Sequence, residues 1–166
     1  MDAGRLRLNL DTVDLTCLIE QSIDDLRAPP EAKSLQIQSE IPAGLEIAGE
    51  THYTALIVQN LFDNARKYNR ADGIIRIRAF QHDDRVELHV LNTGRGIPDA
   101  AQPYIFERFH RAGAGDDVPG HGLGLNLARE LARLHDGELR LVRSDAEWTE
   151  FITVFRAAAP SVSTEG

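Results

Sequence analysis

The order in which the chain changes its hydrophobic period constrains its fold more than any other feature. Stretches in which apolar and polar residues alternate indicate half-buried strands. Most of these stretches come in pairs, and one helical stretch lies between each pair and the next. A doubly wound sheet needs strands and helices to alternate one by one, so this order excludes it. The expected fold is α+β: a two-layer α/β sandwich with a mixed, mostly antiparallel sheet and three helices on one face.

The individual elements follow from hydrophobic spacing and from prolines and glycines at their ends. Strands are expected over residues 5–10, 34–41, 45–48, 73–80, 85–92, 138–142 and 151–155, and helices over 12–28, 50–68 and 123–135. The core face of the last helix is expected to carry Leu123, Leu127, Leu131 and Leu134. The glycine- and proline-rich stretch between residues 93 and 122 predicts a long functional loop. One domain is expected over 1–158, with a frayed tail at 159–166.

Charge and composition narrow the class of partner. The 166 residues carry a formal charge of −8, which argues against a nucleic-acid or membrane-surface binder, because phosphate backbones require a basic face. A polyphosphate ligand remains compatible, since local amides and a few cations bind it. The single cysteine, Cys17, is expected to be a small buried side chain on a helix. No apolar run reaches the roughly 18 residues of a membrane span, so a soluble, cytoplasmic domain is expected.

The helix at 50–68 carries an unusual polar row within NLFDNARKYN. Asn60, Asn64 and Lys67 return to one line at the edge of its apolar stripe, because they are four and seven residues apart. Carboxamide oxygens are hard ligands that suit Mg²⁺, and a lysine one turn on suits phosphate. The alternative is a solvated helix edge with an ion pair between Asp63 and Lys67.

Two glycine-rich segments flank the long loop. In LNTGRGIP, Asn92 stands at the end of a strand, where its side chain can enter a cleft, and Gly94 and Gly96 let backbone approach a ligand. In GHGLGL, residues 120–125, the glycines lie where a helix begins. Exposed amides at a helix N-terminus bind anions, so this segment predicts a phosphate site.

An aromatic segment, YIFERFHR, lies within the same loop. Phe106 and Phe109 are expected to anchor the loop to the core. Arg111 follows them at the base of the loop, which is how an arginine reaches a terminal phosphate.

Together these segments resemble the catalytic ATP-binding domain of bacterial two-component sensor histidine kinases, which shares the Bergerat fold with gyrase, heat-shock chaperone and mismatch-repair ATPases. NLFDNARKY resembles the N box of that family, NTGRG its first glycine box, FERFHR its F box and GHGLGL its second glycine box. The resemblance extends from about residue 4 to residue 156. It implies ATP and Mg²⁺ as cofactors, an ATP lid over residues 107–121, and transfer of the γ-phosphoryl group to a histidine on a separate dimerisation domain.

The resemblance also implies roles for individual residues. Asn60 and Asn64 would hold Mg²⁺, and Asn60 and Arg111 would act in catalysis, Arg111 near the γ-phosphate. Asn60 stands where hydrolytic relatives carry a glutamate that activates water, and an amide cannot act as that base. The implied nucleotide-binding residues are Asn64, Lys67, Tyr68, Asn92, Gly94, Gly96, Gly120, His121, Gly122, Leu123, Gly124 and Thr149.

Three positions depart from the family pattern. Asn92 replaces an aspartate that accepts a hydrogen bond from the adenine amino group; its oxygen can still accept, or its amide can donate to a guanine oxygen. Neutral hydrogen bonds are weaker than charged ones, so adenine binding is expected to be weaker, about tenfold. The segment AEWTEF, residues 146–151, keeps Thr149 but lacks the glycines of a later turn, and His121 replaces a small or polar residue.

No histidine of the chain has the sequence context of a phosphoacceptor. The chain is therefore expected to be the core of a longer, inner-membrane-anchored sensor kinase. Its partners would be the dimerisation domain of that kinase and, downstream, a response regulator. The domain alone would be monomeric and the full kinase a homodimer. A degenerate nucleotide-binding signalling module without kinase activity and a serine kinase of the anti-sigma type are the alternatives.

Overall fold

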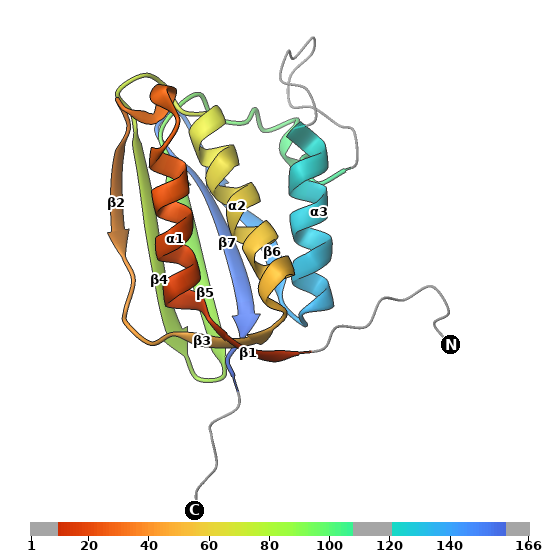
Figure 1. Ribbon diagram of the computed structural model, residues 1–166. Helices are drawn as coiled ribbons and strands as arrows, with labels where there is room; N and C mark the ends of the chain where they lie inside the picture. Colours follow the sequence, from red (N-terminus) through yellow and green to blue (C-terminus); the bar gives the residue numbers. More distant parts are fainter. Residues whose placement is uncertain (1–9, 108–120, 159–166) are drawn as a thin grey trace, which may run out of the picture.

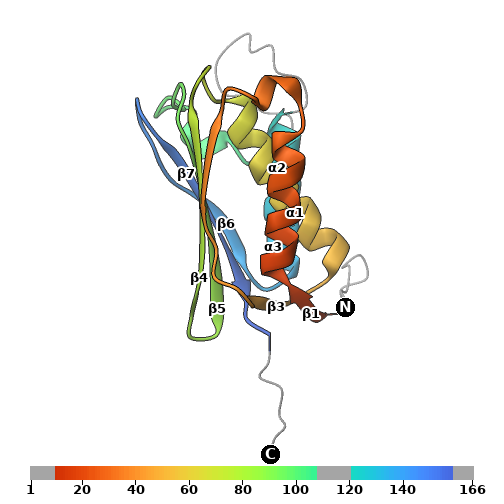
Figure 2. The same ribbon diagram turned by 60° about the vertical axis from the view of Figure 1, so that its left-hand side comes forward.

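The computed structural model describes residues 10–107 and 121–158. It confirms the expected α+β sandwich, with three helices packed on one face of a sheet (Figures 1 and 2). The strands are β1 (Asp11–Asp14), β2 (Gln36–Glu40), β3 (Glu46–Gly49), β4 (Ile74–His82), β5 (Arg85–Asn92), β6 (Glu138–Ser144) and β7 (Thr149–Arg156). The helices are α1 (Leu15–Arg27), α2 (Thr51–Lys67) and α3 (His121–Leu134), with short 3-10 turns η1 (Pro30–Ala32) and η2 (Gln102–Tyr104).

The main sheet has five strands in the order β2-β4-β5-β7-β6. β2 runs parallel to β4, and every other neighbouring pair is antiparallel. β2 and β3, which the sequence suggested as strands joined by a turn, belong to different sheets, because β3 pairs with β1 in a separate two-stranded sheet. The mixed, mostly antiparallel sheet is thus confirmed.

The N-terminal elements differ from the prediction. The strand expected at 5–10 lies almost wholly outside the described residues, and a strand instead occupies Asp11–Asp14, where the helix was expected to have begun. The carboxylate of Asp14 accepts the backbone N–H of Cys17 at 2.9 Å and so caps α1. Cys17 itself is exposed on α1, so the expectation that it would be buried was wrong.

The core lies between the helices and the inner face of the sheet. Strict alternation in the central strands turns every second side chain toward the helices. The largest fully buried apolar side chains are Leu15, Ile19, Ile47, Ile57, Leu61, Phe62, Ile75, Ile77, Leu88, Leu139 and Phe155. This packed layer fixes α2 and α3 against the sheet, which positions the polar row of α2.

α3 begins two residues earlier than predicted, and its buried face is rotated from the expected one. Leu125, Ala128, Leu131 and Ala132 are buried, whereas Leu127 is 44% exposed. The leucine stripe was therefore wrong at Leu127. Each step of four residues turns the side chain by about 40° around the helix axis. A row of leucines spaced by four therefore rotates away from the core, and the buried face of α3 includes Ala128 and Ala132.

A buried histidine joins the far ends of α2 and α3. His135, fully buried, accepts the backbone N–H of Glu50 at Nε2 (3.1 Å), which leaves Nδ1 to donate to the carbonyl of Leu131 (2.7 Å). Both hydrogen bonds are satisfied by one neutral tautomer. At the opposite end of the molecule, α2 ends beside the start of α3 (Figure 1). Within the described ranges, no helix is long and apolar enough to cross a bilayer.

Candidate functional site

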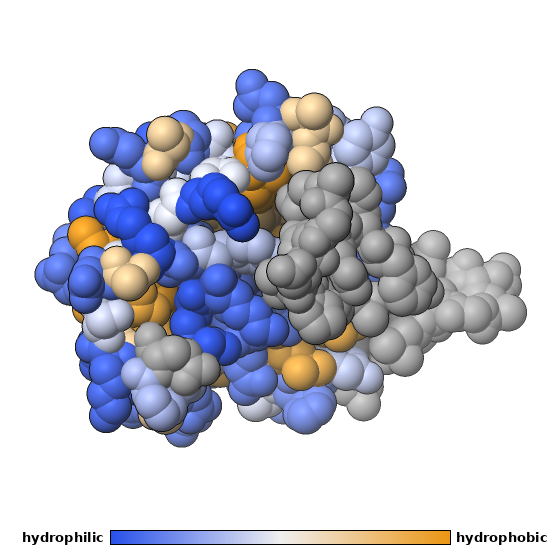
Figure 3. Space-filling model, turned by 90° about the horizontal axis from the view of Figure 1, so that it is seen from above, coloured by the Kyte–Doolittle hydropathy of each residue, from blue (hydrophilic) through white to orange (hydrophobic). Residues whose placement is uncertain are grey.

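The polar row of α2 lies where α2 and α3 pack together. A Cβ at Gly124, near the start of α3, would stand 3.8 Å from Oδ1 of Asn60. The backbone near the start of α3 thus passes close to this amide. Asn64 lies one turn further along α2, toward the end of the molecule where α3 begins. Seen from that end, most of the described surface is hydrophilic, with small apolar areas between (Figure 3).

Asn64 is the most informative residue of this row. It is 6% exposed, and its Oδ1 is buried without a hydrogen-bond partner among the described residues. Leaving a buried acceptor unpaired costs about 1–3 kcal/mol, so a position of this kind suits an oxygen that serves a ligand. No three His, Cys, Asp or Glu side chains group into a metal cluster in the described ranges.

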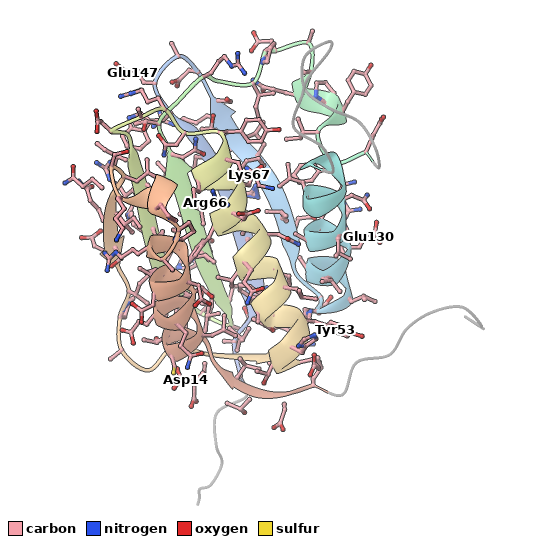
Figure 4. All side chains as sticks on the ribbon, turned by 45° about the horizontal axis from the view of Figure 1, so that its top comes forward. Asp14, Tyr53, Arg66, Lys67, Glu130 and Glu147 are labelled. Carbon is pink, nitrogen blue, oxygen red and sulfur yellow. The ribbon has the colours of Figure 1, made fainter. Side chains whose placement is uncertain are left out.

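The ion pair weighed as the alternative for Lys67 is present. Nζ of Lys67 lies 3.3 Å from Asp63, whose carboxylate also accepts a hydrogen bond from Arg66. Burial raises the pKa of Asp63, but the hydrogen bonds and charges of Arg66 and Lys67 outweigh it and hold the pKa below its usual value. Lys67 lies at the C-terminal end of α2, near the start of α3 (Figure 4), so the ion pair stands beside the site.

Asn92 ends β5 on the inner face of the sheet, in register with Ile75 and Thr149. It is 3% exposed, and its Nδ2 donates to the carbonyl of Thr93 at 2.7 Å. A carbonyl can only face the donor side of the amide, so the hydrogen bond sets the orientation of this side chain. Oδ1 and the second N–H of Nδ2 are not used in this hydrogen bond.

A part-buried polar cluster, which the sequence did not indicate, joins the end of α2 to the end of β5. Thr93 Oγ1 donates to Oδ1 of Asn69 (2.6 Å) and accepts the backbone N–H of Ile74 (2.8 Å). Nδ2 of Asn69 donates to the carbonyl of Ile74 at 3.0 Å. A Cβ on Gly73 would collide with both side chains, so the cluster has no free space. An asparagine directly after a helix end was the only local signal.

The first two glycines are needed for contacts within the chain. Gly94 has φ of 130°, and a Cβ there would collide with the carbonyl of Tyr68 at the end of α2. A Cβ on Gly96 would collide with the carbonyl of Asp145. Both glycines were expected to admit a ligand; the close approach that the structure shows is to the protein backbone itself.

Thr149 helps to hold the segment after Gly96. Its Oγ1 bonds Ser144 Oγ at 2.7 Å, and Ser144 Oγ accepts the backbone N–H of Ile97 at 2.7 Å. The turn between β6 and β7 needs no glycine, because Asp145 accepts the amides of residues 147 and 148, both at 2.9 Å. These two backbone hydrogen bonds lower the pKa of Asp145.

Phe106 anchors the start of the long loop, as predicted. Its ring meets Phe151 edge-on at 6.2 Å, and the guanidinium of Arg129 lies 4.5 Å from its centroid. Its carbonyl accepts Nδ2 of Asn126 at 2.8 Å. Phe109 lies outside the described residues.

The second glycine segment forms the N-terminus of α3. His121, Gly122 and Leu123 are its first three residues, so their backbone amides belong to the helix N-terminus. Arg111 and Gly120, predicted at the γ-phosphate and at the phosphates, lie outside the described residues.

Comparisons with known proteins agree with this geometry. Residues 50–159 match the family described as histidine kinase-, DNA gyrase B-, and HSP90-like ATPase. The adaptive-response sensory kinase SasA of Synechococcus sp. (strain JA-3-3Ab) is 34% identical over 139 residues, which are 82% of this chain and 37% of that protein. The sensor histidine kinase QseE of Escherichia coli O157:H7 is 36% identical over 140 residues, 81% of this chain and 29% of that protein. The chain thus spans well under half of these curated relatives.

The solved structures that resemble this chain also include that of a sensor histidine kinase. The mycobacterial sensor histidine kinase MprB superposes with a TM-score of 0.78 at 26% identity, covering 89% of this chain and 98% of that chain. Full-length ShkA in complex with AMPPNP gives 0.76 at 26% identity, covering 95% of this chain and 33% of that one. The chain therefore belongs to the histidine kinase-, DNA gyrase B- and HSP90-like ATPases, and within them it corresponds to the ATP-binding catalytic domain of sensor histidine kinases.

Proposed function

We propose that this domain binds ATP together with Mg²⁺ between α2 and α3 and donates the γ-phosphoryl group to a histidine on the dimerisation domain of the same kinase. The buried, unpartnered Oδ1 of Asn64 carries the proposal. A carboxamide oxygen is a hard donor of the kind Mg²⁺ accepts alongside water and phosphate oxygens. The complex of the related ShkA with AMPPNP supports a nucleotide in this fold.

Asn64 and Asn60 would hold the ion, since they lie one turn apart on the same face of α2. Bound Mg²⁺ would neutralise charge on the phosphates during transfer. Gly124 brings the backbone of α3 close to Asn60, since a Cβ there would stand 3.8 Å from Oδ1 of Asn60. The 14-residue α3 presents its N-terminal amides at the same place, and a helix N-terminus attracts anions.

Asn92 would read the base. One N–H of its Nδ2 donates to Thr93 and orients the amide, and Oδ1 would serve the ligand as an acceptor. Adenine presents an amino group to such an acceptor, whereas guanine presents a carbonyl oxygen there, which needs a donor. The second N–H of Nδ2 can still donate, so the amide is able to meet either base, and titration with ATP and GTP distinguishes the two possibilities that the sequence left open.

The residue at position 60 suits transfer of the phosphoryl group to a protein rather than to water. Asn60 cannot accept a proton as a general base would, so the site lacks at this position the group that activates water in the hydrolytic relatives. Lys67, which pairs with Asp63 at 3.3 Å, would offer its ammonium to a phosphate as a point charge. Arg111 completes the proposal as the residue near the γ-phosphate.

The wider setting belongs to the proposal as well. The relatives are sensor kinases, so the domain would be the cytoplasmic part of an inner-membrane-anchored homodimer that signals to a response regulator. The fragment alone would be monomeric.

The test uses Asn64→Leu, which removes the amide at nearly constant size. Titration calorimetry should show Mg²⁺-ATP binding weakened at least tenfold, while ATP with chelator changes little, because a lost Mg²⁺ ligand affects only the metal-bound form. The free domain should gain about 1 kcal/mol, since an unpaired buried acceptor is removed. Gln59→Ala, on the exposed face of α2, is the matched control and should change neither quantity. Unchanged Mg²⁺-ATP affinity in Asn64→Leu would refute the metal assignment.

Transfer is tested by adding labelled ATP and the dimerisation domain of a related kinase. Acid-labile label on that domain supports histidine phosphorylation, and acid-stable label would point to the serine kinase. Nucleotide binding without any transfer would favour the signalling module.

A further inference from the structure

The nucleotide site proposed above is divided between two separate parts of the chain. Asn60 and Asn64, at the phosphate end, lie on α2, whereas Asn92, at the base end, terminates β5. A nucleotide that spans both parts is held well only if their separation is fixed, because a displacement of about 1 Å at a reacting centre can cost a hundredfold in rate.

Asn69 and Thr93 join these two parts directly. Asn69 follows the C-terminal residues of α2, five positions after Asn64, and Thr93 is the residue after Asn92. Their side chains meet at 2.6 Å between Thr93 Oγ1 and Asn69 Oδ1. A single side-chain contact therefore connects the end of the metal-bearing helix to the end of the base-bearing strand.

Several hydrogen bonds hold the two side chains of this contact in place. Thr93 is 3% exposed, and its hydroxyl uses its proton on Asn69 while it accepts the N–H of Ile74. The amide of Asn69 is oriented by its own bond to the carbonyl of Ile74. Both side chains lie against Gly73, where a Cβ would collide with them. A hydrogen-bonded network whose members satisfy one another in this way holds its side chains in place.

Thr93 also acts on the base end through its backbone. Its carbonyl accepts Nδ2 of Asn92 and so orients the amide that would contact the base. The neighbouring Gly94 packs against the carbonyl of Tyr68, so backbone contact supports the same junction.

We propose that Asn69 and Thr93 are positioning residues that set the distance between the phosphate end and the base end of the nucleotide site. Neither needs to touch the nucleotide. The inference rests on the proposed function, because it assumes that one nucleotide spans both ends.

A positioning role predicts a distinctive pattern of affinities. A ligand that occupies both ends gains from their fixed spacing as a linked pair of binding groups does. Thr93→Val should therefore weaken Mg²⁺-ATP about tenfold but leave Mg²⁺-tripolyphosphate, which occupies only one end, within twofold of wild type. Thr93→Ser keeps the hydroxyl and should restore Mg²⁺-ATP affinity to within twofold. Asn69→Ala should match Thr93→Val, and the double variant should be no worse than either single one.

Thr16→Val is the matched control. Thr16 is also buried, at 8% exposure, and its hydroxyl likewise donates to a carbonyl, that of Pro42 (2.7 Å), and accepts a backbone amide, that of Leu45 (3.0 Å). It lies at the start of α1, away from the site. Thr16→Val should lower Tm about as much as Thr93→Val and leave the affinity for Mg²⁺-ATP unchanged.

Calorimetric titration of each variant with both ligands distinguishes the outcomes. If wild type binds Mg²⁺-ATP and Thr93→Val binds it equally well, the positioning role is refuted and the proposed function stands. If Thr93→Val weakens Mg²⁺-tripolyphosphate and Mg²⁺-ATP by the same factor, the role is also refuted, because the loss is then general. If wild type binds no Mg²⁺-ATP at all, the proposed function fails and the positioning role fails with it.

Discussion

Asn92→Asp is the change that most sharply tests how the base end works. The family has an aspartate at this position, so a simple expectation is that the substitution only improves the site. The hydrogen bond of 2.7 Å from Nδ2 to the carbonyl of Thr93 gives a different expectation. Asn92 is 3% exposed, so the substitution places a carboxylate oxygen against a carbonyl oxygen where water has little access.

The free domain should lose stability. The lost hydrogen bond and the acceptor left without a donor together cost about 1–3 kcal/mol. For a domain of this size, each kcal/mol corresponds to about 2–4 °C in Tm. Asn92→Asp should therefore lower Tm by about 2–12 °C in the absence of nucleotide.

Nucleotide affinity should move the other way. The contact with Thr93 is lost in the free and the bound protein alike, so its loss does not enter the affinity. A charged acceptor is worth about 1.5–3 kcal/mol against about 0.5–1.5 for a neutral one. The difference, about 1–1.5 kcal/mol, corresponds to roughly tenfold tighter binding of ATP.

Thermal unfolding without ligand and calorimetric titration with ATP, GTP and tripolyphosphate give both quantities. Tripolyphosphate is the internal control and should bind equally well to both proteins. A variant with unchanged Tm would contradict the role of the bond to Thr93. A variant that binds ATP no more tightly would show that Oδ1 of Asn92 does not face the base.

Two further outcomes follow from the structure. Gly94→Ala should destabilise the domain by more than about 2 kcal/mol in urea unfolding, because strain at φ of 130° adds to the collision with Tyr68. The control is Gly44→Ala, at φ of 77° with nothing within 4 Å, which should cost only about 1–2 kcal/mol. Equal losses of stability in the two variants would contradict the collision at Gly94. Asp63 has a lowered pKa in the folded state, so its stabilising contribution, under about 1 kcal/mol for a half-exposed pair, should be present above its usual value of 3.8 and be lost as pH falls through the lower folded value. The difference in unfolding free energy between wild type and Asp63→Asn, measured from pH 7 down to pH 3, should begin to shrink as pH falls below 3.8; a difference that stays constant over this range would contradict this assignment.

The sequence predicted the elements whose signal is local and periodic. The alternation in β4 and β5 and the helical spacing in α2 gave both strands and the helix to within a residue or two. The four-residue β1 was missed because it borders α1 without alternation of its own. The separation of β2 from β3 was missed because strand pairing is non-local.

The same division holds for the site. The row of Asn60 and Asn64 follows from helix geometry and could be placed in advance. The contact between Asn69 and Thr93 joins residues 24 positions apart, and nothing in either segment indicates it. The sequence likewise could not predict why position 94 needs a glycine, because the group that approaches it is the backbone carbonyl at the end of α2.

The buried His135 has a mechanical consequence for the site. It fastens the start of α2 to the end of α3, while the polar row of α2 lies toward the other end of that helix. Asn64 stands 14 residues from Glu50, a lever arm of about 21 Å at 1.5 Å per residue. A tilt of α2 by about 3° around the fastened end would thus move Asn64 by about 1 Å, the scale on which transfer rates change a hundredfold. A disturbance at His135, at the far end of the molecule, would reach the chemistry through the length of the helix without a change in any residue that touches nucleotide.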